Sequence, residues 1–125
     1  MSLTYDTGAL LAAEANRRDT WALHARALAR GQRPVVPAGV LGQAWRGGPQ
    51  APLSRLLRGC RIEDLNDARS RASGKACARA STPDVIDASV VVGALARDDL
   101  VVTSDHEDLS RIADALGRRL RIHRI

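Results

Sequence analysis

The chain has 125 residues, 45% of them hydrophobic, and carries a formal net charge of +5. This length supports one domain with a single core, which we expect to span residues 1–125. No segment approaches the roughly 20 apolar residues of a membrane helix, and no signal-like segment opens the chain, so we expect a soluble, cytoplasmic protein with no membrane partner.

The first half of the chain alternates short apolar segments with helical ones. Residues 3–5 are followed by Asp6 and a run of small residues, which predicts a strand and then a helix over residues 7–14. Gly31 is placed to end a second helix over residues 18–30. The other elements predicted in this half are strands over residues 34–37 and 61–65 and helices over residues 38–46 and 51–58.

The second half holds the longest apolar segment. Asn66 is placed to cap a basic helix that continues to about residue 79, and Ser81, Thr82 and Pro83 predict the start of the next helix. Nearly every position from 85 to 95 is small or aliphatic, so we expect that helix to be buried. The other elements predicted here are a strand over residues 100–103, a helix over residues 108–116 that stops at Gly117, and a strand over residues 120–124. This alternation predicts an α/β fold, with a mostly parallel central sheet flanked by helices.

The positive charge comes almost entirely from arginine, since Lys75 is the only lysine. Guanidinium groups suit phosphate recognition, but a GC-rich coding sequence would give the same enrichment, and both explanations stay open. With no Phe and 2% aromatic residues, we do not expect bases to stack on aromatic side chains. Cys60 and Cys77 lack metal-ligand spacing, so we expect free thiols.

Three acids are candidates for a common site. Asp6 and Asp105 each follow a predicted strand, and ligands of open α/β sheets bind at that edge. Asp87 lies among aliphatic residues, where a carboxylate is costly unless positive charge meets it. Asp84 precedes Asp87 by three residues and shares its helical face. A divalent cation such as Mg²⁺ or Mn²⁺ would offset the mutual repulsion of these groups.

Each acid also has a structural explanation. Asp6 could cap a helix, Asp105 and Asp108 have the spacing of a capping pair, and Asp84 suits the first turn of a helix. Asp98 and Asp99 are interpreted as turn residues. The residues alone leave a metal site and a set of structural acids as equally open interpretations.

Three motifs resemble the PIN-domain family of metal-dependent ribonucleases, and most of all the VapC toxins of bacterial toxin–antitoxin pairs. They are YDTGALLA at residues 5–12, DASVV at residues 87–91 and VVTSD at residues 101–105. The resemblance implies that Asp6, Asp87 and Asp105 bind the metal and catalyse, with Asp108 as a further acid. It also implies Mg²⁺ or Mn²⁺ as cofactor, an RNA substrate, a cognate VapB-type antitoxin and a homodimer.

One position departs from the family pattern. PIN domains commonly carry a Glu on the helix after the second strand, and the nearest residue here is Gln43. Glu14 could partly replace that charge. The leading hypothesis is a Mg²⁺-dependent endoribonuclease toxin; the alternative is a PIN-like RNA- or antitoxin-binding module that cleaves weakly or not at all. A receiver-type domain would need a lysine near a late strand, and Lys75, on a polar helix, does not fit.

Overall fold

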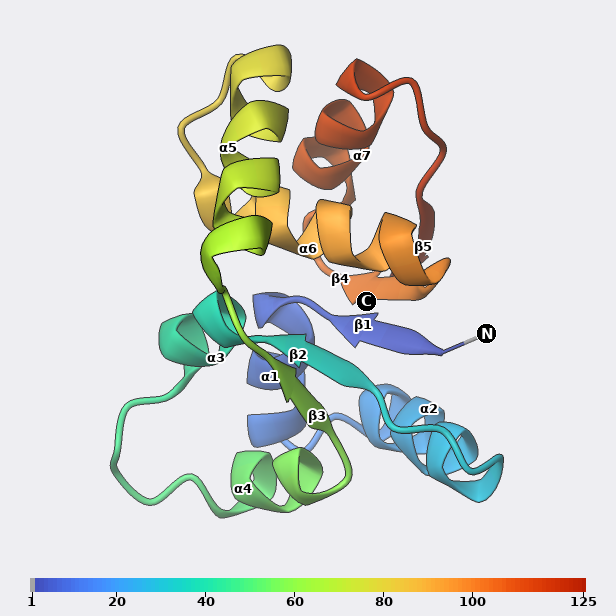
Figure 1. The fold of residues 1–125 in the computed structure, drawn as a ribbon. Helices are drawn as coiled ribbons and strands as arrows, with labels where there is room; N and C mark the ends of the chain where they lie inside the picture. Colours follow the sequence, from blue (N-terminus) through green and yellow to red (C-terminus); the bar gives the residue numbers. More distant parts are fainter. Residues whose placement is uncertain (1) are drawn as a thin grey trace.

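A computed structural model describes residues 2–125, which form a five-stranded sheet with helices on both faces (Figure 1). The strand order is β3-β2-β1-β4-β5 and every pairing is parallel. The strands are β1 (Leu3–Tyr5), β2 (Val35–Pro37), β3 (Arg61–Glu63), β4 (Leu100–Thr103) and β5 (Arg121–Arg124). The predicted α/β fold with a parallel central sheet is confirmed.

Seven helices connect the strands within the described residues. They are α1 (Thr7–Glu14), α2 (Arg18–Ala29), α3 (Ala38–Ala44), α4 (Ala51–Arg58), α5 (Asp67–Ala80), α6 (Val85–Arg97) and α7 (His106–Ala115). Helices α5, α6 and α7 lie on one side of the sheet, and α1, α2 and α4 lie on the other (Figure 1). No helix among these residues is long and apolar enough to cross a membrane.

The core surrounds the central strands. All residues of β1 and β2 are buried, as are Val101, Val102 and Thr103 of β4, which is expected for parallel strands covered on both faces. Helix α6 packs its small aliphatic residues on this sheet, and Ala88, Val90 and Val91 are fully buried. The prediction of a buried helix here is confirmed.

Two helix starts differ from the prediction. Ser81 ends α5 in a left-handed conformation, with φ at 55°, instead of opening α6. Asp84 is the N-cap of α6, and its carboxylate accepts a hydrogen bond of 2.9 Å from the Asp87 N–H. A carboxylate three residues further along thus takes the place of the predicted hydroxyl cap. Helix α7 begins at His106 rather than at Asp108, with Asp105 as its N-cap.

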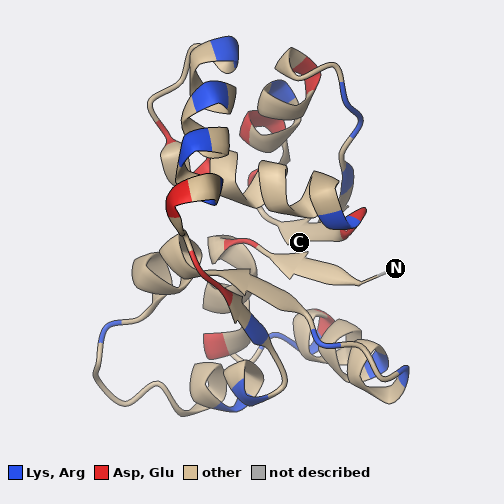
Figure 2. Ribbon diagram, viewed as in Figure 1, with Lys and Arg blue, Asp and Glu red and all other residues tan. Residues whose placement is uncertain are grey.

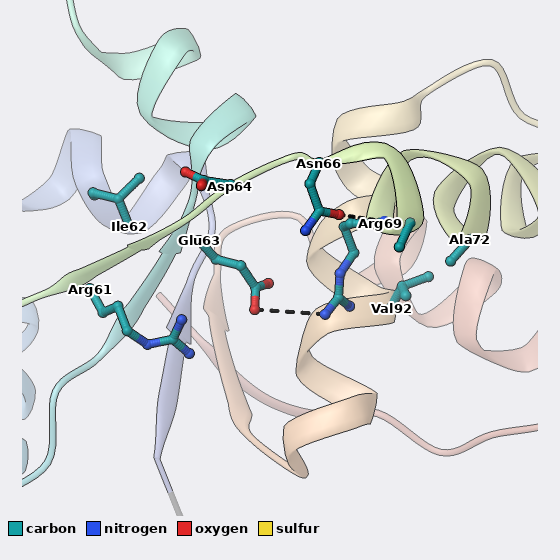
Figure 3. A pocket seen from close by; sticks show the side chains of 9 residues that line it. Arg61, Ile62, Glu63, Asp64, Asn66, Arg69, Ala72 and Val92 are labelled. Atoms are coloured by element: carbon teal, nitrogen blue, oxygen red, sulfur yellow. Dashed lines mark hydrogen bonds and ion pairs between the residues drawn. The ribbon is translucent and has the colours of Figure 1, made fainter.

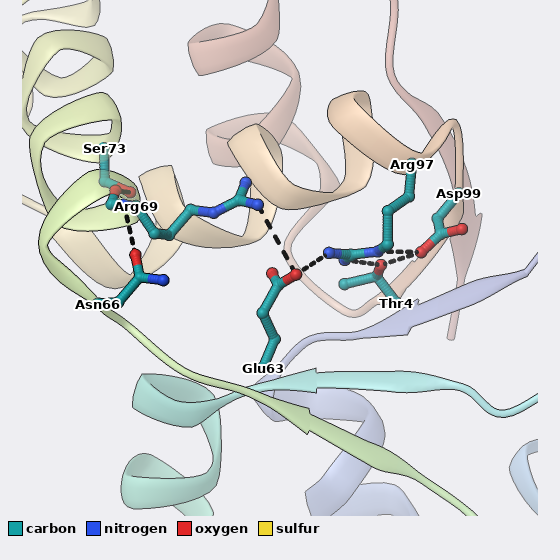
Figure 4. Close-up of polar contacts among 7 residues, drawn as sticks. All are labelled: Thr4, Glu63, Asn66, Arg69, Ser73, Arg97 and Asp99. Carbon is teal, nitrogen blue, oxygen red and sulfur yellow. Dashed lines mark hydrogen bonds and ion pairs between the residues drawn. The ribbon is translucent and has the colours of Figure 1, made fainter.

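A buried polar network crosses the α6 face of the sheet (Figure 4). The Thr4 hydroxyl donates a 2.8 Å hydrogen bond to Asp99, which is 3% exposed. Arg97 donates to Asp99 at 2.9 Å and also to Glu63 and Thr4. A Cβ at Gly93 would lie 2.7 Å from the Glu63 carboxylate, so the glycine leaves room for this network. Asp99 is therefore a core residue as well as a turn residue.

Candidate metal and catalytic site

The predicted acids meet where the strand order reverses. From β1 the chain passes to β2 on one side of the sheet, whereas β4 and β5 lie on the other side. Ligands of open α/β sheets bind in the crevice at such a point. Asp6 follows β1 directly, and its N–H donates a 3.0 Å hydrogen bond to Val102 of β4. The ends of β1 and β4 therefore hold Asp6 and the β4–α7 loop side by side.

Asp6 is 5% exposed and is held by a threonine. The Thr103 hydroxyl donates a 2.8 Å hydrogen bond to Oδ2 of Asp6 and accepts a 2.9 Å hydrogen bond from the Asp105 N–H. Asp6 is the N-cap residue of α1, yet its side chain makes no capping hydrogen bond, and neither does that of Asp105. The capping explanation for these two acids thus lacks its hydrogen bonds.

Asp87 lies in the first turn of α6, partly buried and facing the other acids. Burial raises the pKa of its carboxyl to about 7, and the charges of Asp84 and Asp6 add to this effect. Burial and the Asp108 charge also raise the pKa of Asp105. Carboxylate oxygens of Asp87 and Asp105 lie within 4.8 Å of each other, and Thr103 links Asp6 to Asp105, so the structure brings together the three predicted acids.

The donor set fits a hard divalent cation. Carboxylate oxygens of Asp87, Asp105 and Asp108 all lie within 4.8 Å of one another. A cation with bonds of about 2.1 Å separates opposite ligands by about 4.2 Å, so small side-chain rotations suffice to bind one. Asp6 lies outside this group of three, and Oδ2 of its carboxylate accepts a hydrogen bond from Thr103. Asp108 is therefore better placed as a direct ligand than the sequence indicated.

Gln43 and Glu14 occupy different places relative to these acids. The Gln43 side-chain carbonyl accepts a hydrogen bond from the hydroxyl of Thr7, the residue after Asp6, so Gln43 borders the site. Glu14 accepts a 3.2 Å hydrogen bond from the Leu53 N–H at the start of α4. It lies eight residues beyond Asp6, about 12 Å along α1. Glu14 thus stabilises the N-terminus of α4.

A close backbone approach, which the sequence did not predict, supports the site. A Cβ on Gly8 would lie 2.2 Å from Oγ of Ser104, so α1 can approach the β4–α7 loop only because this residue is glycine. The role of Thr103 in holding Asp6 was not predicted either. Gly8 lies inside the motif at residues 5–12, and Thr103 lies inside the motif at residues 101–105. The hydroxyl of Thr103, close to the strand-end acid Asp105, was the signal in the sequence that could have indicated its role.

Figure 2 shows how charge is distributed around the site. Acidic segments lie where β1 ends and where the chain enters α6, whereas basic segments follow α5 and reach the C-terminal strand. The basic positions of α5 are Arg69, Arg71, Lys75 and Arg79. An acidic centre with basic surroundings suits a ligand that carries both a cation and negative charge.

Of the comparisons with known proteins, only that with solved structures shows the fold. No protein-family model matches the chain, and no curated protein matches it in sequence. A solved structure, VapBC2 from Rickettsia felis bound to a DNA fragment from its promoter, matches 100% of this chain and 99% of its own with a TM-score of 0.72 and 16% identity. The predicted resemblance is confirmed at the level of the fold: the chain has a PIN-like fold and matches the VapBC2 structure over its whole length.

Proposed function

We propose that this protein is a Mg²⁺-dependent endoribonuclease and the cytoplasmic toxin of a VapBC-type toxin–antitoxin pair. The observation that carries the proposal is the grouping of the Asp87, Asp105 and Asp108 carboxylates within 4.8 Å at the point where the strand order reverses. The fold shared with VapBC2 supports the same conclusion.

Each acid has a role in this proposal. Asp87 and Asp105 would hold the cation, with Asp108 as a further ligand, and Asp6 faces them with its carboxylate oriented by Thr103. A bound Mg²⁺ or Mn²⁺ would lower the pKa of a coordinated water and offset charge on the scissile phosphate. Arginines around the site would position the RNA backbone.

Incubating purified protein with total RNA, with and without Mg²⁺, tests the proposal when the new ends are mapped. Cleavage should require the cation and should be lost in Asp87→Asn, which keeps the side-chain shape and removes the charge. Asp67→Asn is the matched control, because Asp67 is an exposed acid that pairs with Arg71 on α5. Equal cleavage by the wild type and Asp87→Asn would refute the site.

The alternative, a binding module with weak cleavage, is supported by Gln43. Its amide supplies no charge, and its carbonyl is already engaged by Thr7. A Gln43→Glu variant should bind Mg²⁺ more tightly and cleave faster if the missing charge limits activity. Calorimetric titration with Mg²⁺ measures whether the site binds the cation, and RNA cleavage with and without Mg²⁺ then separates the two functions, since a pure binding module shows no metal-dependent turnover.

The partners follow from the fold and from the sequence resemblance. VapBC2 is a toxin–antitoxin complex bound to promoter DNA, which supports a VapB-type antitoxin as the partner of this chain. The homodimer and the RNA substrate rest on the sequence resemblance alone. Light scattering of the isolated chain, and co-purification with the product of a neighbouring reading frame, test the two protein partners.

A further inference from the structure

A second cavity lies beside the edge strand β3, between that strand and helices α5 and α6 (Figure 3). Its volume is about 530 Å³, within the usual range of ligand pockets. It is lined by Arg61, Ile62, Glu63, Asp64, Asn66, Ala68, Arg69, Ala72 and Val92. The proposed function assigns no role to it.

Side-chain alternation along the strand directs charge into this cavity. Arg61 and Glu63 project on the side that faces α5, whereas Ile62 and Asp64 project on the opposite side (Figure 3). Arg61 and Arg69 point toward the Glu63 carboxylate from opposite directions in this view. The cavity therefore gathers two guanidinium groups around one carboxylate.

Arg97 already holds Glu63, so the Arg61 guanidinium is left without a carboxylate partner among the described residues. Arg97 donates a hydrogen bond to Glu63 from within the buried network, and Arg69 lies 3.7 Å from the same carboxylate, beyond hydrogen-bonding distance. Among residues 2–125, no hydrogen bond or ion pair involves the Arg61 side chain. Arg61 and Arg69 thus have unused donors.

The remaining lining adds a donor and an apolar wall. Oδ1 of Asn66 accepts a 2.8 Å hydrogen bond from the Arg69 N–H, which leaves the amide Nδ2 to donate into the cavity (Figure 3). Ala68, Ala72 and Val92 form the apolar side. Guanidinium groups bind phosphate in a bidentate manner, and small apolar side chains can accommodate a sugar or base.

We propose that this cavity is a phosphate-binding subsite for a single RNA strand whose scissile phosphate lies at the acid cluster; the proposal rests on the proposed function. Glu63 ends β3 at the sheet edge where Asp6 follows β1, and two strand spacings separate β3 from β1 by about 10 Å. A few nucleotides span this distance.

Fluorescence anisotropy of a short labelled single-stranded RNA, measured in EDTA so that no cleavage occurs, tests the subsite. Arg61→Gln should weaken binding about tenfold and reduce the slope of log affinity against log salt by about 0.7, the loss of one phosphate contact. Arg119→Gln is the control, because Arg119 is an exposed arginine on the α7–β5 loop. Circular dichroism melting checks that all variants fold.

The outcomes also separate this inference from the proposed function. If Arg61→Gln binds RNA as tightly as the wild type, or if the wild type binds no RNA, the subsite is refuted even where metal-dependent cleavage is observed. If binding depends on Arg61 but no cleavage occurs with Mg²⁺, the subsite stands and the nuclease proposal fails.

Two further arms identify the ligand. Inorganic phosphate should displace the RNA only at millimolar concentrations; tight, Arg61-dependent binding of free phosphate would identify a small-anion site and overturn the RNA proposal. The co-purified antitoxin should bind Arg61→Gln and the wild type equally. Unchanged RNA affinity together with weakened antitoxin binding would instead assign the cavity to an acidic protein segment.

Discussion

The hydroxyl of Thr103 donates a 2.8 Å hydrogen bond to the carboxylate of Asp6, although the two residues are 97 positions apart in the sequence. Both side chains are buried. Because the same hydroxyl accepts from the Asp105 N–H, one threonine orients two of the three predicted acids. It adds a side-chain link to the backbone hydrogen bond between Asp6 and Val102 at the ends of β1 and β4.

Replacing Thr103 by valine should therefore reduce both stability and RNA cleavage. Valine keeps the shape but leaves the buried Asp6 carboxylate without its donor, at a cost of about 1–3 kcal/mol. The free energy of unfolding in urea measures this loss. Thr103→Ser retains the hydroxyl and should retain most of the cleavage rate, so equal defects in both variants would contradict an orienting role.

Asp87→Asn should stabilise the metal-free protein while abolishing its response to Mg²⁺. Burial and neighbouring acids raise the pKa of Asp87 to about 7, so its ionised form destabilises the folded state above that pH. Removing the charge should add about 1 kcal/mol in EDTA at about pH 8, allowing for solvent screening.

Thermal melting with and without Mg²⁺ checks the second half of this prediction. A ligand present at 100 times its dissociation constant stabilises by about 2.7 kcal/mol, so the wild-type melting temperature should rise with the cation. The Asp87→Asn midpoint should not rise. Asp67→Asn, on the exposed side of α5, should behave as the wild type does. An equal rise in all three proteins would place the cation elsewhere.

Gly8→Ala should disturb the approach of α1 to the β4–α7 loop. The added Cβ would lie 2.2 Å from Oγ and 3.0 Å from Cβ of Ser104, so the helix and loop must separate. We expect a loss of about 1–3 kcal/mol and slower cleavage, since Asp6 and Asp105 flank this contact. Adding Ser104→Gly should restore part of both quantities.

Gly74→Ala provides the control for this substitution. Gly74 lies inside α5, and a Cβ added there would meet no atom within 4 Å, so alanine should stabilise by about 0.5–1 kcal/mol. The free energy of unfolding should therefore fall in Gly8→Ala and rise in Gly74→Ala. Stabilisation by Gly8→Ala would show that the loop gives way without cost.

The sequence was sufficient to predict the sheet and the proximity of Asp6, Asp87 and Asp105, because both depend on local patterns. Apolar segments that end in an acid predict a strand and its carboxyl edge, and parallel strands bring such edges together. Asp6 and Asp105 are thus linked through the Thr103 hydroxyl despite their separation in sequence. Ser81 misled the prediction because its hydroxyl and the Asp84 carboxylate compete as caps, and the left-handed turn at Ser81 ends α5 instead.

The buried network could not be predicted from local pattern. Arg97 and Asp99 flank a turn, and charged residues at a turn usually indicate a segment exposed to solvent. Only the tertiary packing places Glu63 of β3 and Thr4 of β1 against them. The position of Asp108 among the metal-binding candidates likewise depends on how α7 leaves β4, which spacing alone leaves open.

His24 should make stability fall at acidic pH. Its ring is 3% exposed, shares a 2.8 Å hydrogen bond with the Tyr5 hydroxyl, and packs against Trp21. Burial lowers the pKa of His24 below its usual 6.5, so the unfolded chain binds a proton first and stability decreases as pH falls through about 6.5.

Glutamine at this position can still hydrogen-bond Tyr5 but does not titrate. The difference in unfolding free energy between wild type and His24→Gln should therefore shrink from about pH 8 to about pH 5. Asp87 changes stability with pH in the opposite direction, but it is present in both proteins, so its contribution cancels in this difference. A difference that stays constant across this range would show that His24 binds protons equally in the folded and unfolded states, so that folding does not lower its pKa.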